Sequence, residues 1–336
     1  MTTLITRRLI VLVAVLGLAG PASAQETKLF LTSMSPAGTH NSRFFADLAE
    51  RLTNASNGAF RVESRDGTTL ANFGNIYQRV NDDVVQIGWA LLPLLEGTFP
   101  LSTVGALPLV TDNPADGSTA FWRLYKSGAL DSGFKGVIPL CLMVHVPYQI
   151  HLTKAPKSFD DLGRVNIIAA SKANASVVRA LNGTPLSLDP GDIYQSIHRG
   201  LAGGTIISWT SVEPYKLDEV TTYHLEGPFG TTTSMLFMSR KKYESLPPAA
   251  RKAIDSIGGE ALSREFGKYL GDQAALSRKP VAASDKHTIK TLSDAEVKVL
   301  EPKLGPLVDE WVRAQPGRPD VLAKFRAIYA DVRGKQ

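Results

Sequence analysis

The chain has 336 residues, of which 43% are hydrophobic and 21% are charged, and its 37 basic and 32 acidic residues give a formal charge of +5. So small a basic excess, spread along the chain, argues against the concentrated positive surface of a nucleic-acid-binding protein. A chain of this length usually forms two domains with separate cores. Its one cysteine, Cys141, cannot form an internal disulfide, and the apolar run around it predicts a buried thiol.

The first 24 residues are typical of a secretory signal peptide. Arg7 and Arg8 precede an apolar run at residues 9–18, and the sequence ASA at residues 22–24 is a cleavage site of the A-x-A type. The apolar run is shorter than the roughly 20 residues of a membrane-spanning helix. We therefore expect cleavage after Ala24 and a mature protein in the periplasm. A twin-arginine signal is an alternative, although the residues after the arginine pair fit it poorly.

Patterns of strand and helix alternate along the next part of the chain. Short apolar or alternating runs predict strands at residues 28–33, 60–63, 84–87, 138–145 and 149–153. Helical spacing is seen in Phe44, Leu48 and Leu52, and further helices are expected within residues 70–81 and 115–127. This alternation predicts an α/β fold.

Residues 159–217 carry the clearest pattern of this kind. Strands are expected at residues 165–170, 184–188 and 205–209, with helices at residues 171–181 and 190–199 between them. Asp189 at the N-cap and Pro190 at the first helical position are start signals for the second helix. A β-α-β-α-β unit builds a parallel sheet, in which ligands bind beyond the carboxyl ends of the strands.

This stretch resembles the solute-binding proteins of tripartite ATP-independent periplasmic (TRAP) transporters, of the DctP type. The likeness rests on the segments SFDDLGRVNIIAAS, RALNGTPLSLDPGDIYQSIHRGLAGG and WTSVEPYKL, and it continues through FPLSTVGALPLV before them and MSRKKYESLPPAARKAID after them. It implies a two-lobed α/β periplasmic binding protein with a hinge and a central ligand cleft. Such a protein captures a small organic solute and delivers it to a TRAP membrane permease. We expect a monomer that needs no cofactor and no metal.

The resemblance also implies how the chain is divided. The first lobe is expected to contain residues 25–148 and 235–275, and the second lobe residues 149–234 and 276–336. A long helical pattern at residues 249–276 is interrupted only by two glycines. Ser293 and Glu296 form a capping box that starts a further helix, and a last helix is expected at residues 321–332. The C-terminal helices are expected to belong to the second lobe.

The candidate ligand-binding residues follow from the strand ends and from the resemblance. Trp209 ends the last strand of the β-α-β-α-β unit, where family members often have a tryptophan, and Ile207 shares its strand face. The family's carboxylate-binding arginine falls at Ile168, and Asn166 would be a neutral hydrogen-bonding group on the same face. Trp209 as a core residue remains an alternative. Further candidates lie near loops that would line the cleft: Trp89, Tyr148, His40, Asn72, Phe229 and His151.

These residues predict the kind of solute. With Ile168 in place of an arginine, the expected wall of Ile168, Ile207 and Trp209 suits a solute with an apolar or aromatic body. The solute is either neutral or has its carboxylate held elsewhere, by His40, Tyr148 or His151. A carboxylate buried against these walls without a partner would be costly, so we expect short dicarboxylates to bind poorly.

The sequence lacks the motifs of common enzymes. Its six histidines never form the H-E-x-x-H pattern of zinc proteases, and neither a G-x-S-x-G elbow nor a phosphate-binding P-loop is present. We therefore expect a binding protein and not an enzyme. A periplasmic enzyme on a similar two-domain scaffold, or a ligand-sensing subunit of a membrane receptor, remains an alternative.

Overall fold

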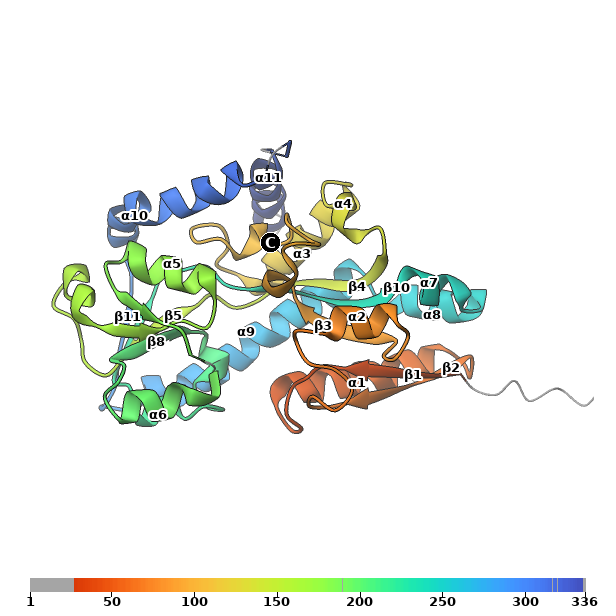
Figure 1. Ribbon diagram of the computed structural model, residues 1–336, viewed down its shortest axis with the longest axis horizontal. Coiled ribbons are helices and arrows are strands. Elements are labelled where there is room, and N and C mark those ends of the chain that lie inside the picture. Colours follow the sequence, from red (N-terminus) through yellow and green to blue (C-terminus); the bar gives the residue numbers. More distant parts are fainter. Residues whose placement is uncertain (1–26, 189, 316, 319, 335–336) are drawn as a thin grey trace, which may run out of the picture.

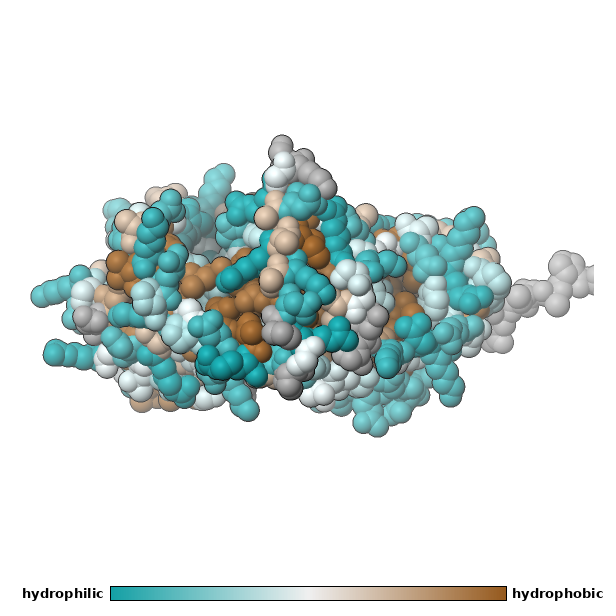
Figure 2. Space-filling model, turned by 90° about the horizontal axis from the view of Figure 1, so that it is seen from above, coloured by the Kyte–Doolittle hydropathy of each residue, from teal (hydrophilic) through white to brown (hydrophobic). Residues whose placement is uncertain are grey.

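The fold is taken from a computed structural model that describes residues 27–188, 190–315, 317–318 and 320–334 (Figure 1). The expected signal peptide with its cleavage site at Ala24, and the expected N-cap Asp189, lie outside the described residues. Two lobes lie side by side, each built on its own β-sheet. Among the described helices, none is both long and apolar enough to span a bilayer. Seen from above, apolar surface gathers over the middle of the molecule, between more hydrophilic ends (Figure 2).

The first lobe is built on a five-stranded sheet with the order β2-β1-β3-β10-β4. β1 pairs in parallel with β2 and β3, whereas β10 runs antiparallel to β3 and β4. The strands are β1 (Thr27–Thr32), β2 (Phe60–Arg65), β3 (Ile87–Leu91), β4 (Val137–Val144) and β10 (Thr233–Ser239). Each face of this sheet is covered by a separate apolar cluster, so the sheet forms the middle layer of the lobe.

Helices form these two covering layers. The predicted helix with Phe44, Leu48 and Leu52 is α1, in which all three side chains are buried, and Thr39 caps it by accepting from the backbone N–H of Ser42. The helices of this lobe are α1 (His40–Ala55), α2 (Ile76–Asn81), α3 (Pro114–Lys126), α4 (Asp131–Phe134), α7 (Arg240–Ser245) and α8 (Pro248–Ile257). Cys141 is buried in the core, as predicted.

The second lobe contains a six-stranded sheet with the order β11-β9-β5-β8-β6-β7. The predicted β-α-β-α-β unit is confirmed, because β6 pairs in parallel with both β7 and β8. Its elements are β6 (Asn166–Ile168), α5 (Lys172–Ala180), β7 (Thr184–Leu186), α6 (Ile193–His198) and β8 (Gly204–Ile207). β5 (Gln149–Leu152) pairs antiparallel with β8 and with β9 (Tyr223–Glu226), and β9 pairs in parallel with β11 (Thr288–Thr291).

Two extended segments and two helices connect the lobes. The chain passes from β4 to β5 in a first crossing segment and later returns from β9 to β10 in a second crossing segment. These two segments are hydrogen-bonded to each other. The N–H of His145 donates to the carbonyl of Thr232 at 3.0 Å, and the N–H of Tyr148 donates to the carbonyl of Gly230 at 2.9 Å. The third connection is the long helix α9 (Glu260–Ala282), which runs between the lobes in Figure 1. Paired strands beside a helix are the kind of link about which two lobes can rotate.

The last helices differ from the sequence-based division. The capping box of Ser293 and Glu296 starts α10 (Asp294–Arg313), which packs on the second lobe through Leu300 and Leu304 and on the first lobe through Val308. α11 (Val321–Gly334) instead packs against α3 of the first lobe and buries Phe325 there. Its apolar stripe could be read from the sequence, but the surface that covers the stripe could not.

Candidate functional site

A hydrogen-bonded cluster lies beside the crossing segments in the first lobe. The indole Nε1–H of Trp89 donates to the Ser234 hydroxyl at 3.0 Å, and this hydroxyl lies 2.7 Å from Nε2 of His145. Burial, and to a smaller extent the charge of His40, lowers the pKa of His145 to about 3. His145 is therefore neutral near pH 7. The serine oxygen accepts from Trp89, and the same hydroxyl also contacts the sulfur of Met143 at 3.6 Å.

His40 is the first residue of α1 and lies near this cluster. Burial lowers its pKa, and the nearby Arg43 lowers it further. The hydroxyl of Tyr269, on α9, donates to the backbone carbonyl of His40 at 2.9 Å, which fixes the start of α1 against the connecting helix. Because the side chain is only partly buried, a half-buried neutral imidazole remains at the edge of the first lobe.

Trp209 forms the centre of a second cluster, in the second lobe. It follows the end of β8, in a short 3-10 turn, and is only 3% exposed. Its backbone N–H donates to Oε1 of Gln149 at 3.0 Å, and its indole Nε1–H donates to Oε1 of Glu226 at 2.9 Å. The guanidinium of Arg278 lies 6.0 Å from the centre of the ring. The indole is thus held in one orientation by partners on β5, β9 and α9.

Glu226 connects this tryptophan to the helix between the lobes. Its carboxylate accepts from Arg278 Nε at 2.7 Å. Burial would raise the pKa of Glu226, but hydrogen bonds from Arg278, Thr291 and Trp209 together hold it below its ordinary value. The carboxylate is therefore ionised, and Arg278 is its fixed counter-ion. The guanidinium of Arg278 is therefore already paired within the protein.

Three histidines form a chain beneath Trp209. His151 Nε2 lies 3.2 Å from the carbonyl oxygen of Ile207, His151 Nδ1 lies 2.7 Å from His224 Nδ1, and His224 Nε2 lies 3.1 Å from His287 Nδ1. Burial, with a smaller contribution from neighbouring histidines, lowers the pKa of His151 to about 3 and that of His224 to about 4. The carbonyl of Ile207 can only accept, so His151 donates to it through Nε2. With neutral rings, His224 then donates to His151, and His287 donates to His224.

Tyr148 lies in the first crossing segment and is partly buried. Burial raises the pKa of its phenol, although side-chain hydrogen bonds with Thr232 and Asn174 act in the opposite direction. Thr232 belongs to the second crossing segment, and Asn174 lies in the first turn of α5. Tyr148 therefore brings a neutral hydroxyl to the place where both crossing segments meet the second lobe.

The structure brings some predicted residues together and separates others. Ile168, Ile207 and Trp209 pack into one apolar cluster, with Ile168 fully buried. Asn166 lies at the opposite, amino end of β6, where its amide donates to the carbonyl of Leu201 at 3.3 Å. It is therefore not a neighbour of Trp209.

The remaining predicted residues have visible structural roles. Asn72 accepts from the backbone N–H groups of Gly74 and Asn75 at 2.9 and 3.1 Å, and so shapes the turn before α2. Phe229 is 1% exposed, within the second-lobe core. His151 is fully buried, with both ring nitrogens engaged. Trp89 is 4% exposed, and His40 and Tyr148 are the most accessible of the polar candidates that lie beside the crossing segments.

Several important residues were not selected from the sequence. They are His145, His224, Gln149, Glu226 and Arg278. Gln149 and Glu226 are direct partners across β5 and β9, as are His151 and His224. Strand register would have identified these pairs, but the register of two strands so far apart in the chain is not visible in the sequence. Within the residues that the structure describes, no cluster of three or more histidine, cysteine or acidic side chains could hold a metal ion.

Known proteins share both this sequence pattern and this fold. A family model for bacterial extracellular solute-binding protein, family 7, matches residues 32–315. A TRAP solute-binding protein from Rhodoferax ferrireducens, crystallised with copurified benzoate, superposes with a TM-score of 0.82 at 25% identity, covering 92% of this chain and 99% of that one. A marine metagenome protein of an unidentified microbe, described as specific for aromatic acid ligands and crystallised with 3-hydroxybenzoate, gives 0.81 at 25% identity, covering 92% and 98%.

A curated relative is described as an outer membrane transporter protein. The outer membrane transporter protein TsaT of Comamonas testosteroni is 24% identical over 313 residues, covering 91% of each chain. The family match runs from the end of β1 to the end of α10 and so covers most of both lobes. The chain therefore belongs to the bacterial extracellular solute-binding proteins of family 7.

Proposed function

We propose that this protein captures an aromatic or similarly apolar organic monoacid in the periplasm and delivers it to a TRAP membrane permease. The observation that carries this proposal is the apolar cluster of Ile168, Ile207 and Trp209. The resemblance described above implies that the family's arginine falls at Ile168. Arg278, whose guanidinium lies 6.0 Å from the centre of the Trp209 ring, is already paired with Glu226. Two similar proteins were crystallised with benzoate and 3-hydroxybenzoate, which supports the same class of solute.

The carboxylate of such a solute would be held by neutral donors. His151 is unsuitable, since its two nitrogens already contact His224 and Ile207. Tyr148 and His40 remain, and both are partly accessible side chains with a proton to donate. Neutral hydrogen bonds to one carboxylate can offset the cost of its burial, whereas a second carboxylate would stay unpaired.

The solute preference can be measured by calorimetry with a panel of compounds. We expect benzoate, 3-hydroxybenzoate and phenylacetate to bind, and succinate and malate to bind at least 10-fold more weakly. Tyr148→Phe should weaken benzoate binding roughly 5- to 30-fold, as expected for about 1–2 kcal/mol of a hydrogen bond to a charged group. Asn72→Ala is the matched control, because its side chain serves a turn. Tight succinate binding would show that an unrecognised cation holds the solute.

Solute binding should also bring the lobes together. Burial raises the pKa of Glu96 in the first lobe, and the charge of Lys172 in the second lobe partly opposes this rise, so the two lobes already face each other there. A solute that contacts both lobes favours the closed arrangement. We expect X-ray scattering to give a smaller radius of gyration with benzoate than without it, and no change with succinate. An unchanged radius at saturating benzoate would contradict closure.

We further propose that the protein has no catalytic activity. The one serine–histidine pair in its site, Ser234 and His145, lacks an accessible nucleophile, because Ser234 is fully buried and its hydroxyl is engaged by Trp89. Incubation with benzoate and with its esters and amides should leave each compound unchanged by mass spectrometry. We also propose maturation by cleavage after Ala24 and a monomeric state. The mass of the secreted protein and its sedimentation coefficient measure these two properties.

A further inference from the structure

A hollow of about 580 Å³ lies in the second lobe, and its wall residues Ile197 and Ala202 belong to the same apolar cluster as Trp209. It is lined by the end of β5 and the segment that follows, by the start of β6, and by the turn between α6 and β8. These are the amino ends of β6 and β8, whereas Trp209 follows the carboxyl end of β8. An occupant of this hollow, which we call the distal basic hollow, would not compete with a solute beside Trp209.

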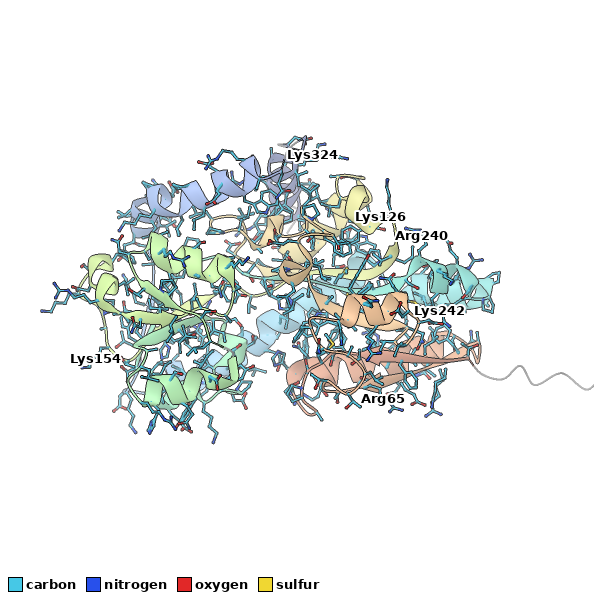
Figure 3. All side chains as sticks on the ribbon, in the orientation of Figure 1. Arg65, Lys126, Lys154, Arg240, Lys242 and Lys324 are labelled. Carbon is cyan, nitrogen blue, oxygen red and sulfur yellow. The ribbon has the colours of Figure 1, made fainter. Side chains whose placement is uncertain are left out.

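The residues that line the distal basic hollow carry a net positive charge. Lys154, Lys157 and Arg164 line it and are exposed, and none of them forms an ion pair with any residue that the structure describes. The acid among the lining residues is Asp161, whose Oδ2 accepts from the backbone N–H groups of Lys157 at 2.9 Å and of Ser158 at 3.1 Å. In Figure 3, Lys154 points away from the lobe at its outer end.

The same hollow carries apolar surface. Leu201 lies on its rim with 61% of its surface exposed, and Ile197 and Ala202 are buried beside it. The turn that presents Leu201 is closely packed, since a Cβ on Gly203 would lie 2.6 Å from a methyl group of Val165. A large apolar side chain is thus held in water beside three cations by a tightly packed turn.

We propose that the distal basic hollow docks an acidic segment of the membrane permease that receives the solute, with Leu201 packing against an apolar side chain of that segment. This inference rests on the proposed delivery function. A small anion is a poor occupant, because each exposed cation attracts it only weakly through water and salt. A segment with several carboxylates contacts all three cations at once and also covers Leu201. Such a surface would raise the rate of encounter as well as the affinity.

Charge reversal in the full-length mature protein tests this proposal. The variant carries Lys154→Glu, Lys157→Glu and Arg164→Glu together, and its control carries Lys126→Glu, Lys241→Glu and Lys252→Glu. The control residues are exposed lysines of the first lobe that form no ion pair with any described residue, so both variants change the net charge equally. Binding to the permease in lipid nanodiscs is measured by surface plasmon resonance, and benzoate affinity is measured by calorimetry.

We expect the dissociation constant for the permease to rise at least 10-fold in the variant and less than 2-fold in the control, with benzoate affinity unchanged in both. Leu201→Ser, which removes no charge, should raise the dissociation constant for the permease about 3-fold or more. For the unaltered protein, increasing the salt from 50 to 300 mM should weaken docking. Equal permease affinity in the variant and the control would overturn the docking site alone. Failure of the unaltered protein to bind the permease would overturn the delivery function with it.

Discussion

Replacement of Trp209 by alanine is expected to lower the free energy of unfolding by about 3–5 kcal/mol. The side chain is almost fully buried in the cluster with Ile168 and Val281, so its loss leaves a cavity. It also removes an N–H that donates to the Glu226 carboxylate. Urea unfolding followed by circular dichroism at 25 °C measures the change without relying on tryptophan fluorescence.

Trp209→Phe is the matched variant for this experiment. It keeps an aromatic ring in the cluster but cannot donate to Glu226, which retains Arg278 and Thr291 as partners. We expect a smaller loss, of about 1–2 kcal/mol. If Trp209→Ala were as stable as the unaltered protein but no longer bound benzoate, Trp209 would be a wall of the ligand site with no role in packing.

Mild acid is expected to destabilise the protein before its carboxylates titrate. The pKa of a histidine in an unfolded chain is near 6.5, whereas burial lowers it to about 3 in His145 and His151 and to about 4 in His224. Below pH 6.5 the unfolded chain therefore binds more protons than the folded one, so stability falls as the pH falls. Each of these histidines can remove up to about 1.4 kcal/mol per pH unit. The fall in the free energy of unfolding should be measurable between pH 6.5 and about 4.5.

A histidine substitution separates this effect from general acid unfolding. His224→Gln removes one buried imidazole, so the dependence of unfolding free energy on pH should be less steep between pH 6.5 and 4.5, even though the variant is less stable at neutral pH. His198→Gln is the control, since His198 is exposed on α6 and stacks only on Tyr194. An identical slope in His224→Gln and the unaltered protein would assign the acid sensitivity to other groups.

Local sequence patterns predicted the helices and strands of this protein better than they predicted which elements lie next to one another. The β-α-β-α-β unit and the capping box of Ser293 depend on residues close together in the chain, and both were correct. The position of Asn166 relative to Trp209 was misjudged because the side-chain face was considered without the direction of the strand. Asn166, at the amino end of β6, contacts Leu201, whereas Ile168, at its carboxyl end, packs in the cluster with Trp209.

Contacts between distant segments were the features that the sequence could not supply. The six histidines show no local motif, yet the antiparallel register of β5 and β9 places His151 against His224, and the parallel pairing of β9 with β11 brings this edge of the sheet close to His287. Similarly, the apolar stripe of α11 was evident, but its packing on α3 depends on the surface that the rest of the fold leaves uncovered. Such information comes from tertiary register and not from periodicity.

The position of β10 also has a consequence for how the chain folds. It pairs with both β3 and β4 in the first sheet, but it follows the entire β-α-β-α-β unit of the second lobe in the chain. A polypeptide that is synthesised from its N-terminus thus has an incomplete first sheet until residue 239 has emerged. Until then, the edges of β3 and β4 lack their shared partner. Non-local pairing of this kind slows folding and leaves open edges to which other chains can add. During synthesis or export, a chaperone that masks strand edges would therefore be most needed before β10 appears.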